Sequence, residues 1–218
     1  MKPLRDRLQE YLEENPFLEE ALHNGLLNLS AVARSWKDRL DRDQGESVSE
    51  ASVIMALRRM EPTIPKSTML KLKQFTSDFG DIIVRSDLAD FTFNNSPTIA
   101  SSQSEFLRRI KDQISWFYTF SKGVSETTII ISRDATTALL ESFSNERMTQ
   151  QTLDLASITI MLPQASINTM GLYYYIFRTL TLRGINICEV ISTTNEFTLV
   201  VSKKDIEKSF EVIHQMRK

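Results

Sequence analysis

The residues best suited to chemistry lie in one loop and one strand near the C-terminus. The loop, residues 164–171 (Gln-Ala-Ser-Ile-Asn-Thr-Met-Gly), separates an apolar strand pattern from a helical pattern. N–H groups at a helix N-terminus lack intrahelical acceptors and suit a carboxylate, and Gly171 lets a ligand approach the backbone. The facing strand, residues 186–189, offers main-chain groups, and Glu189 suits an ammonium group. The pattern therefore predicts a site that binds both ends of an α-amino acid. The candidate ligand-binding residues are Gln164, Ser166, Asn168, Thr169, Met170, Gly171, Asn186, Ile187, Cys188 and Glu189.

Each of these residues also has a purely structural interpretation. Gly171 could simply start a helix, and residues 166–169 could form an ordinary capped loop. The three tyrosines at 173–175 are more typical of packing than of binding. Cys188 lies between apolar positions and is expected to be a small buried residue.

The sequence carries few residues for other chemistries. It has one cysteine, which excludes an internal disulfide and a cysteine-based zinc site. Its two histidines, His23 and His214, lie far apart, and it contains neither GxxxxGK[ST] nor GxGxxG. We therefore expect no metal, no cofactor and no enzymatic activity.

The length and charge of the chain limit its partners. It has 218 residues, enough for one large domain or two small ones, and 26 basic against 28 acidic residues give a net charge of −2. This balance does not favour a polyanionic partner. No apolar run approaches the roughly 20 residues that span a bilayer, and the N-terminus lacks a signal-like stretch. We expect a cytoplasmic protein without a membrane partner.

The first 60 residues have the apolar periodicity of helices. Leu4, Leu8, Tyr11 and Leu12 form one stripe, and a second segment begins after Asn15-Pro16. Two further segments follow, for which Ser30 and Ser49 are the expected N-caps, and Pro62 and Pro65 bracket a linker. The polar residues 41–48 are expected to connect the third and fourth segments.

Short runs of β-branched and aromatic residues replace this pattern from about residue 75. The last 65 residues follow the order strand, helix, strand, strand, helix, and the same order fits residues 79–145 more loosely. Two helices on one face of a small antiparallel sheet form an α+β sandwich. The sequence therefore predicts two copies of one module.

The second copy contains a specific series of segments. Residues 158–163 lead into the loop 164–171, followed by Leu-Arg-Gly-Ile-Asn-Ile-Cys-Glu-Val-Ile-Ser-Thr-Thr at 182–194. Phe-Thr-Leu-Val-Val at 197–201 and Lys-Lys-Asp-Ile-Glu-Lys-Ser-Phe-Glu-Val-Ile-His at 203–214 complete the series. These residues resemble an ACT domain, the amino-acid-binding regulatory module, in the version found in aspartate kinases.

The resemblance implies two ferredoxin-like (βαββαβ, ACT-type) modules at 75–150 and 151–218, packed side by side, with the ligand where two modules meet. The kinase domain that precedes such pairs in aspartate kinases has no room in this sequence, and the helical pattern predicts a helical domain at 1–74 in its place. Two features depart from the family. Tyrosines stand where lysine-binding members have an acidic residue, and no fourth strand follows the last helix. Residues 148–154 or a strand of the other module must cover that sheet edge.

The helical domain has two possible roles. Part of it resembles a helix-turn-helix. However, residues 41–48, which are expected to connect the third and fourth helical segments, are longer than the usual 3–4-residue turn. Residues 1–75 hold 12 basic and 12 acidic side chains, so DNA binding would need a concentrated basic face or a dimer. A dimerisation or docking element is the other interpretation. The candidate nucleic-acid-binding residues are Arg34, Ser49, Ser52, Arg58 and Arg59.

Together these patterns predict a non-enzymatic amino-acid sensor, expected to be a homodimer. Its tandem ACT-like modules would bind a small amino acid and alter the output of the helical domain, with transcription as the first hypothesis. The alternative is a stand-alone regulatory subunit or docking protein for a biosynthetic enzyme such as aspartate kinase, without DNA binding.

Overall fold

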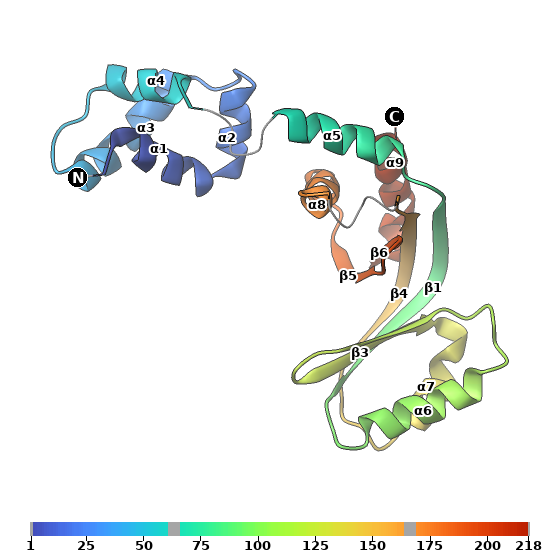
Figure 1. Cartoon of the computed structure of the whole chain (residues 1–218). Helices are drawn as coiled ribbons and strands as arrows, with labels where there is room; N and C mark the ends of the chain where they lie inside the picture. Colours follow the sequence, from blue (N-terminus) through green and yellow to red (C-terminus); the bar gives the residue numbers. More distant parts are fainter. Residues whose placement is uncertain (1, 61–65, 164–168, 218) are drawn as a thin grey trace. The chain divides into compact units, whose positions relative to one another are not determined.

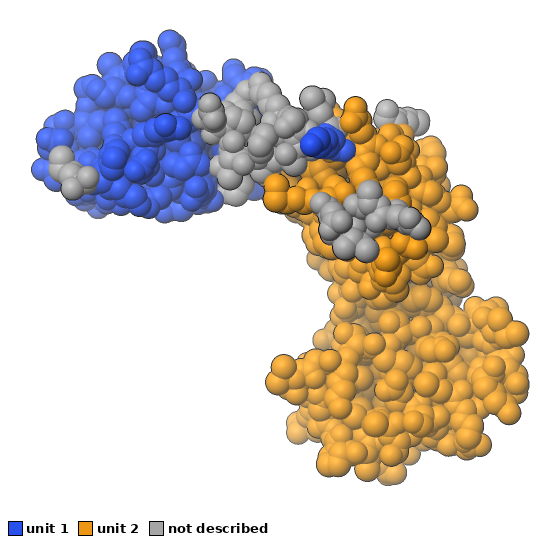
Figure 2. Space-filling model, viewed as in Figure 1, with its two compact units in different colours: residues 1–71 blue, residues 72–218 orange. Residues whose placement is uncertain are grey.

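The structure, a computed structural model, describes residues 2–60, 66–163 and 169–217. The chain forms two compact units, residues 1–71 and 72–218 (Figure 2). The linker expected at Pro62 and Pro65 lies outside the described residues.

The first unit consists of helices. Four of them pack around a cluster that includes Leu8, Tyr11, Leu40 and Leu57, each exposed by no more than 1%. A fifth helix starts in this unit and ends in the second. The helices are α1 (Leu4–Glu13), α2 (Pro16–His23), α3 (Leu29–Gln44), α4 (Glu50–Arg58) and α5 (Lys66–Ser77).

Two expectations for α3 are wrong. Its N-cap is Asn28, whose side chain accepts a hydrogen bond from the N–H of Ala31, and Ser30 already lies inside the helix. The helix also continues to Gln44 and ends at Gly45, whose φ of 72° fits a left-handed C-cap. The connection to α4 therefore consists of residues 45–49. The expected N-cap of α4, Ser49, is confirmed by its bond from the N–H of Ser52.

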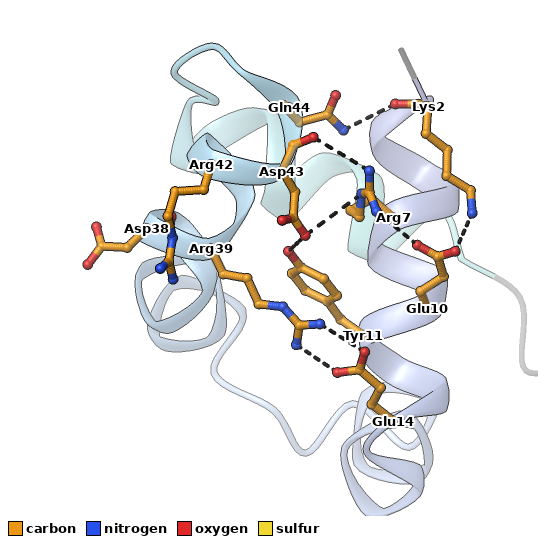
Figure 3. A network of polar contacts seen from close by, with 10 residues as sticks. All are labelled: Lys2, Arg7, Glu10, Tyr11, Glu14, Asp38, Arg39, Arg42, Asp43 and Gln44. Atoms are coloured by element: carbon orange, nitrogen blue, oxygen red, sulfur yellow. Dashed lines mark hydrogen bonds and ion pairs between the residues drawn. The ribbon is translucent and has the colours of Figure 1, made fainter.

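Polar contacts hold α1 against α3 (Figure 3). The buried Tyr11 donates its hydroxyl to Asp43 Oδ2 at 2.7 Å, and burial, then the Asp43 carboxylate, raise the pKa of Tyr11 to about 12. The Arg39 guanidinium lies 3.9 Å from the centre of the Tyr11 ring and binds both Glu14 oxygens, at 2.6 and 2.8 Å. These side chains explain why the polar end of α3 remains helical.

Replacing Tyr11 with Phe should therefore destabilise the first unit by about 1.5 kcal/mol, the contribution of a hydrogen bond to a charged group. Urea unfolding of the full chain, followed at Trp36, reports this change because Trp36 contacts Tyr11 edge-to-face at 5.4 Å. The measurement uses a Trp116→Phe background. Tyr118→Phe, in the second unit, is the control, and equal unfolding of both variants would contradict the prediction.

The second unit contains one six-stranded antiparallel sheet in the order β2-β3-β1-β4-β6-β5. Its elements run strand, helix, strand, strand, helix twice, and we call these the first repeat (residues 82–142) and the second repeat (residues 148–216). The first repeat contains β1 (Ile82–Asn94), α6 (Ile99–Ile110), β2 (Tyr118–Lys122), β3 (Glu126–Ser132) and α7 (Thr136–Ser142). The second contains β4 (Met148–Met161), α8 (Leu172–Leu182), β5 (Ile187–Ser192), β6 (Glu196–Ser202) and α9 (Ile206–Met216).

The long strands β1 and β4 pair with each other and run through both halves of the sheet (Figure 1). Residues 82–85 and 88–93 of β1 pair with β4 of the second repeat, and residues 88–94 also pair with β3 of the first. In β4, residues 155–161 pair with β6. A strand of the other repeat thus covers the edge for which the sequence offered no fourth strand.

The midpoints of β1 and β4 carry the same motif, Asp-Leu-Ala, starting at Asp87 and Asp154. Both aspartates have φ of 57°, a left-handed conformation that aspartate adopts more readily than most residues. Asp87 binds Lys203 of the second repeat at 2.6 Å, and Asp154 binds Arg133 of the first at 2.8 Å. The two repeats are therefore linked by reciprocal ion pairs.

Each face of the sheet has its own core. Alternate residues of β1 and β3, among them Phe91 and Ile129, pack against α6 and α7 in one cluster. The residues between them point to the opposite face, away from α6 and α7, which we call the helix-free face. There Leu88, Ile130, Leu155 and Val200 form a second cluster. Because its members come from both repeats, this cluster joins them.

Candidate functional site

The loop before α8 is the first part of the candidate site. Gly171 is the N-cap of α8 and has φ of 85°, which a residue with a side chain rarely adopts. A Cβ added there would lie 3.4 Å from Cδ1 of the buried Leu72. The Tyr175 N–H donates to the Gly171 carbonyl at 2.9 Å, so helical bonding begins one turn later. The N–H groups of the first turn have no acceptor within the helix.

A cavity of about 220 Å³, which we call the α8 cavity, lies at this helix start. Such a volume is below the roughly 300–1,000 Å³ of sites for drug-sized ligands and suits a small molecule. One wall is fixed by Tyr173, whose hydroxyl lies 2.9 Å from Ser192 Oγ and whose ring stacks on Phe197 at 4.8 Å. The lining residues are Thr169, Gly171, Leu172, Tyr173, Tyr174, Thr193 and Thr194.

The chemistry of the α8 cavity favours an anionic group. The positive end of the α8 dipole meets residues that carry hydroxyl groups, and both stabilise a carboxylate. No carboxylate lines the cavity in the described part of the chain, so a cationic ligand side chain finds no counter-ion there. Across the described ranges, no group of three or more His, Cys, Asp or Glu residues could hold a metal ion.

The structure places only some of the predicted ligand residues at this cavity. Thr169 and Gly171 line it, and the neighbouring Met170 is 73% exposed and does not. The other three predicted residues of the loop, Gln164, Ser166 and Asn168, lie outside the described residues.

The predicted residues of β5 lie elsewhere. Glu189 is paired with Val200, whose side chain belongs to the cluster on the helix-free face. Ser192, which binds Tyr173, is at the other end of β5 from Asn186 and Ile187. Cys188 is exposed, contrary to the expectation of a buried residue, because β5 forms an edge of the sheet. Partial burial and the nearby Asp90, Glu189 and Asp205 raise the pKa of its thiol.

Sequence reasoning missed Asp90, a carboxylate on the helix-free face. Asp90 is 4% exposed, and its Oδ1 has no hydrogen-bond partner among the described residues. Burial and the negative charge of Glu189 raise its pKa to about 6. The corresponding residue of β4, Ser157, is also buried with an unpaired Oγ. The signal in the sequence was an acidic residue inside the apolar run Leu-Ala-Asp-Phe-Thr-Phe.

The five candidate nucleic-acid-binding residues are all exposed in the first unit. Arg34 forms an ion pair with Glu50 at 3.7 Å, which reduces its positive charge toward a partner. Ser49 and Ser52 bind each other at the start of α4, and Arg58 and Arg59 lie at its end. In the described part of the chain, no helix has the length and apolar character needed to cross a membrane.

No protein-family model matches the sequence, and no curated protein matches it significantly. Solved structures do match. The regulatory subunit of aspartate kinase from Thermus thermophilus, in its ligand-free form, has a TM-score of 0.52 and 14% identity, and the match covers 64% of this chain and 99% of that chain. A structure of aspartokinase alpha and beta subunits has a TM-score of 0.51 and 16% identity, with 63% and 97% covered.

Aspartate kinase from Clostridium acetobutylicum has a TM-score of 0.53 and 14% identity, and the match covers 64% of this chain but 35% of that one. The similarity is therefore to the regulatory part of such enzymes. At these identities it is a similarity of fold. The chain has the mixed α/β fold of aspartate kinase regulatory regions, and the resemblance predicted from residues 158–214 is confirmed at that level.

Proposed function

We propose that this chain is a non-enzymatic regulatory protein that binds a small α-amino acid in the α8 cavity. The observation that carries the proposal is an open cavity at the N-terminus of α8, within a fold similar to that of the regulatory subunit of an aspartate kinase. The ligand carboxylate binds N–H groups of the first turn that have no acceptor within the helix. Its ammonium group binds hydroxyl and main-chain oxygens from the residues around Thr193 and Thr194.

The ligand acts by linkage between the site and an output surface. It stabilises one arrangement of the two repeats. A coupling free energy of about 1–3 kcal/mol between the ligand site and the output surface changes the affinity of that surface for its partner 5- to 150-fold. The absence of a carboxylate from the described cavity lining favours an amino acid with a small, uncharged side chain. The proposed regulatory protein is a homodimer.

Two outputs are compatible with the helical unit. The fold match to a separate regulatory subunit supports docking on a partner enzyme such as an aspartate kinase. The exposed Arg58 and Arg59 at the end of α4 support DNA binding, and the Arg34–Glu50 pair weakens it. Fluorescence anisotropy with genomic DNA fragments at two salt concentrations separates the two outputs, because binding to phosphates falls steeply with salt.

Thermal melting of the full chain against the twenty amino acids tests the ligand proposal. A ligand at 100 times its dissociation constant adds about 2.7 kcal/mol to the free energy of unfolding. Thr193→Trp fills the α8 cavity from an exposed turn and should weaken binding at least tenfold. Val124→Trp, in the exposed β2–β3 turn of the first repeat, is the matched control and should bind normally.

Glu189→Gln tests whether the site extends to β5. Because Glu189 interacts with Asp90 on the helix-free face, we expect unchanged ligand affinity in this variant. A loss of affinity would instead show that Glu189 belongs to the site and binds the ligand ammonium group. If no amino acid shifts the melting temperature of the native chain, the sensor proposal fails.

A further inference from the structure

Helix α5 begins in the first unit and ends in the second, because the boundary between the units falls within it. From the boundary onward, every inward-facing position follows the spacing i, i+3, i+4, i+7 of one helix face. Leu72, Thr76 and Phe79 are buried at these positions, and Phe75 is half-buried and contacts the Phe79 ring edge-to-face at 6.1 Å. The second half of α5 is therefore packed into the second unit, although the helix leads out of the first.

The first residue of this buried face, Leu72, packs against the start of α8. Its Cδ1 lies 3.4 Å from the position that a Cβ on Gly171 would occupy. Gly171 is the N-cap of α8 and also lines the α8 cavity. A ligand that fixes the start of α8 thus fixes the surface against which Leu72 packs.

The chain that follows α5 is connected to the opposite side of the cavity. The N–H of Gly80 donates to the Met161 carbonyl at the end of β4, at 2.9 Å, and a Cβ on Gly80 would lie 3.0 Å from the Met161 Cβ. The next residue of the chain after Met161, Leu162, donates its N–H to the Asn195 carbonyl at 2.7 Å. Asn195 belongs to the turn 193–195, whose first two residues line the cavity. The two ends of this half of α5 are therefore linked to two walls of the cavity.

We propose that α5 is the element that couples the α8 cavity to the helical unit, with Leu72 as the positioning residue between them. The proposal rests on the proposed function of the α8 cavity. A ligand that holds Gly171 in place stabilises the packed position of α5, and by linkage the packing of α5 stabilises the bound ligand by the same factor. Because α5 is one continuous helix, a change at Leu72 reaches the end of the helix that lies in the first unit.

Two glycine variants test this coupling without any ligand. Gly171 and Gly184 flank α8 and have φ of 85° and 69°, so an alanine is strained at either position. The added methyl group meets Leu72 at position 171, whereas nothing lies within 4 Å of it at position 184. Hydrogen exchange of the full chain, read on peptides that cover residues 66–77, should be faster in Gly171→Ala than in the native chain and unchanged in Gly184→Ala. Equal exchange of α5 in the two variants would overturn the proposal.

Leu72 variants test the same coupling with a ligand, using each amino acid that shifts the melting temperature of the native chain. The amino acid should slow the exchange of α5 in the native chain. By calorimetric titration, Leu72→Ala should bind it at least about fivefold more weakly, and Leu72→Met, which conserves volume, should bind almost normally. Leu139→Ala is the matched control, because it removes a buried leucine from the core of the first repeat and should keep the native affinity.

Two results with a bound amino acid would overturn the proposal. One is native affinity in Leu72→Ala, and the other is α5 exchange that the amino acid leaves unchanged in the native chain. If the native chain binds no amino acid, the proposed function fails, and the two glycine variants still decide whether α5 responds to the start of α8.

Discussion

Replacing Leu88 or Leu155 with alanine should lower the free energy of unfolding of residues 72–218 by about 3–5 kcal/mol, the upper range for a buried leucine. Both side chains are 1% exposed and belong to the cluster on the helix-free face. They occupy equivalent positions in the two Asp-Leu-Ala motifs and face each other in the β1–β4 pair. The two variants should therefore lose similar stability.

The same experiment tests whether the two repeats unfold together. Since β1 and β4 each pair with strands of both repeats, neither repeat keeps a complete sheet when the other unfolds. Calorimetry should show one transition for residues 72–218 in Leu155→Ala, at a lower temperature. Leu182→Ala, at a position 61% exposed, is the control. A variant whose second repeat melts alone would show that the shared strands do not couple the repeats.

Much of the fold could be predicted because it depends on local patterns. The apolar stripe of α1 and the Ser49 cap of α4 are signals within one or two turns. The order of strands and helices in the second repeat, together with its resemblance to ACT domains, identified the fold that the solved structures confirm. The end of α3 was missed because its polar residues are stabilised by other side chains. Tyr11 of α1 binds Asp43 through a tertiary contact, and Lys37 binds Asp41 from the preceding turn of α3.

The sequence left open which strand covers the edge of the second repeat, because polar residues hide the full length of β1 and β4. Residues 85–87 and 148–154 interrupt the apolar runs, so each long strand looked like shorter segments. Their pairing joins residues far apart in sequence, which no local pattern reports. The position of Glu189 away from the α8 cavity has a related cause. A bulge between Ile187 and Glu189 in the β5–β6 pair shifts the register, and register decides the face to which a strand residue points.

The second large effect concerns the buried carboxylate of Asp90. Its side chain is 4% exposed, Oδ1 is unpaired among the described residues, and Glu189 adds a like charge. These features raise its pKa from 3.8 to about 6. Glu189 and Cys188 are the titratable groups that interact with Asp90, and each contributes negative charge or none. Ionisation of Asp90 therefore opposes folding.

The sign of the pH effect follows from linkage. Because the folded pKa is higher than the unfolded value, the unfolded chain loses this proton first as the pH rises. Below about pH 4 Asp90 is protonated in both states, and its ionisation costs no stability. Between pH 4 and 6 the free energy of unfolding falls, and above that range the loss remains constant. A shift of about two pKa units corresponds to about 3 kcal/mol at most.

Asp90→Asn removes this ionisation, so the variant should gain stability relative to the native chain as the pH rises from 4 to 7, by up to about 3 kcal/mol. The absolute difference at one pH also contains the hydrogen bonding of the new amide, whereas the change with pH does not. Asp90→Ser, which copies Ser157 of the second repeat, should show the same trend, and the exposed Asp134→Asn should not. Urea unfolding at several pH values measures all three. If the stability of native chain and Asp90→Asn changes in parallel from pH 4 to 7, Asp90 ionises as freely in the folded protein as in the unfolded chain, and its burial carries no electrostatic cost.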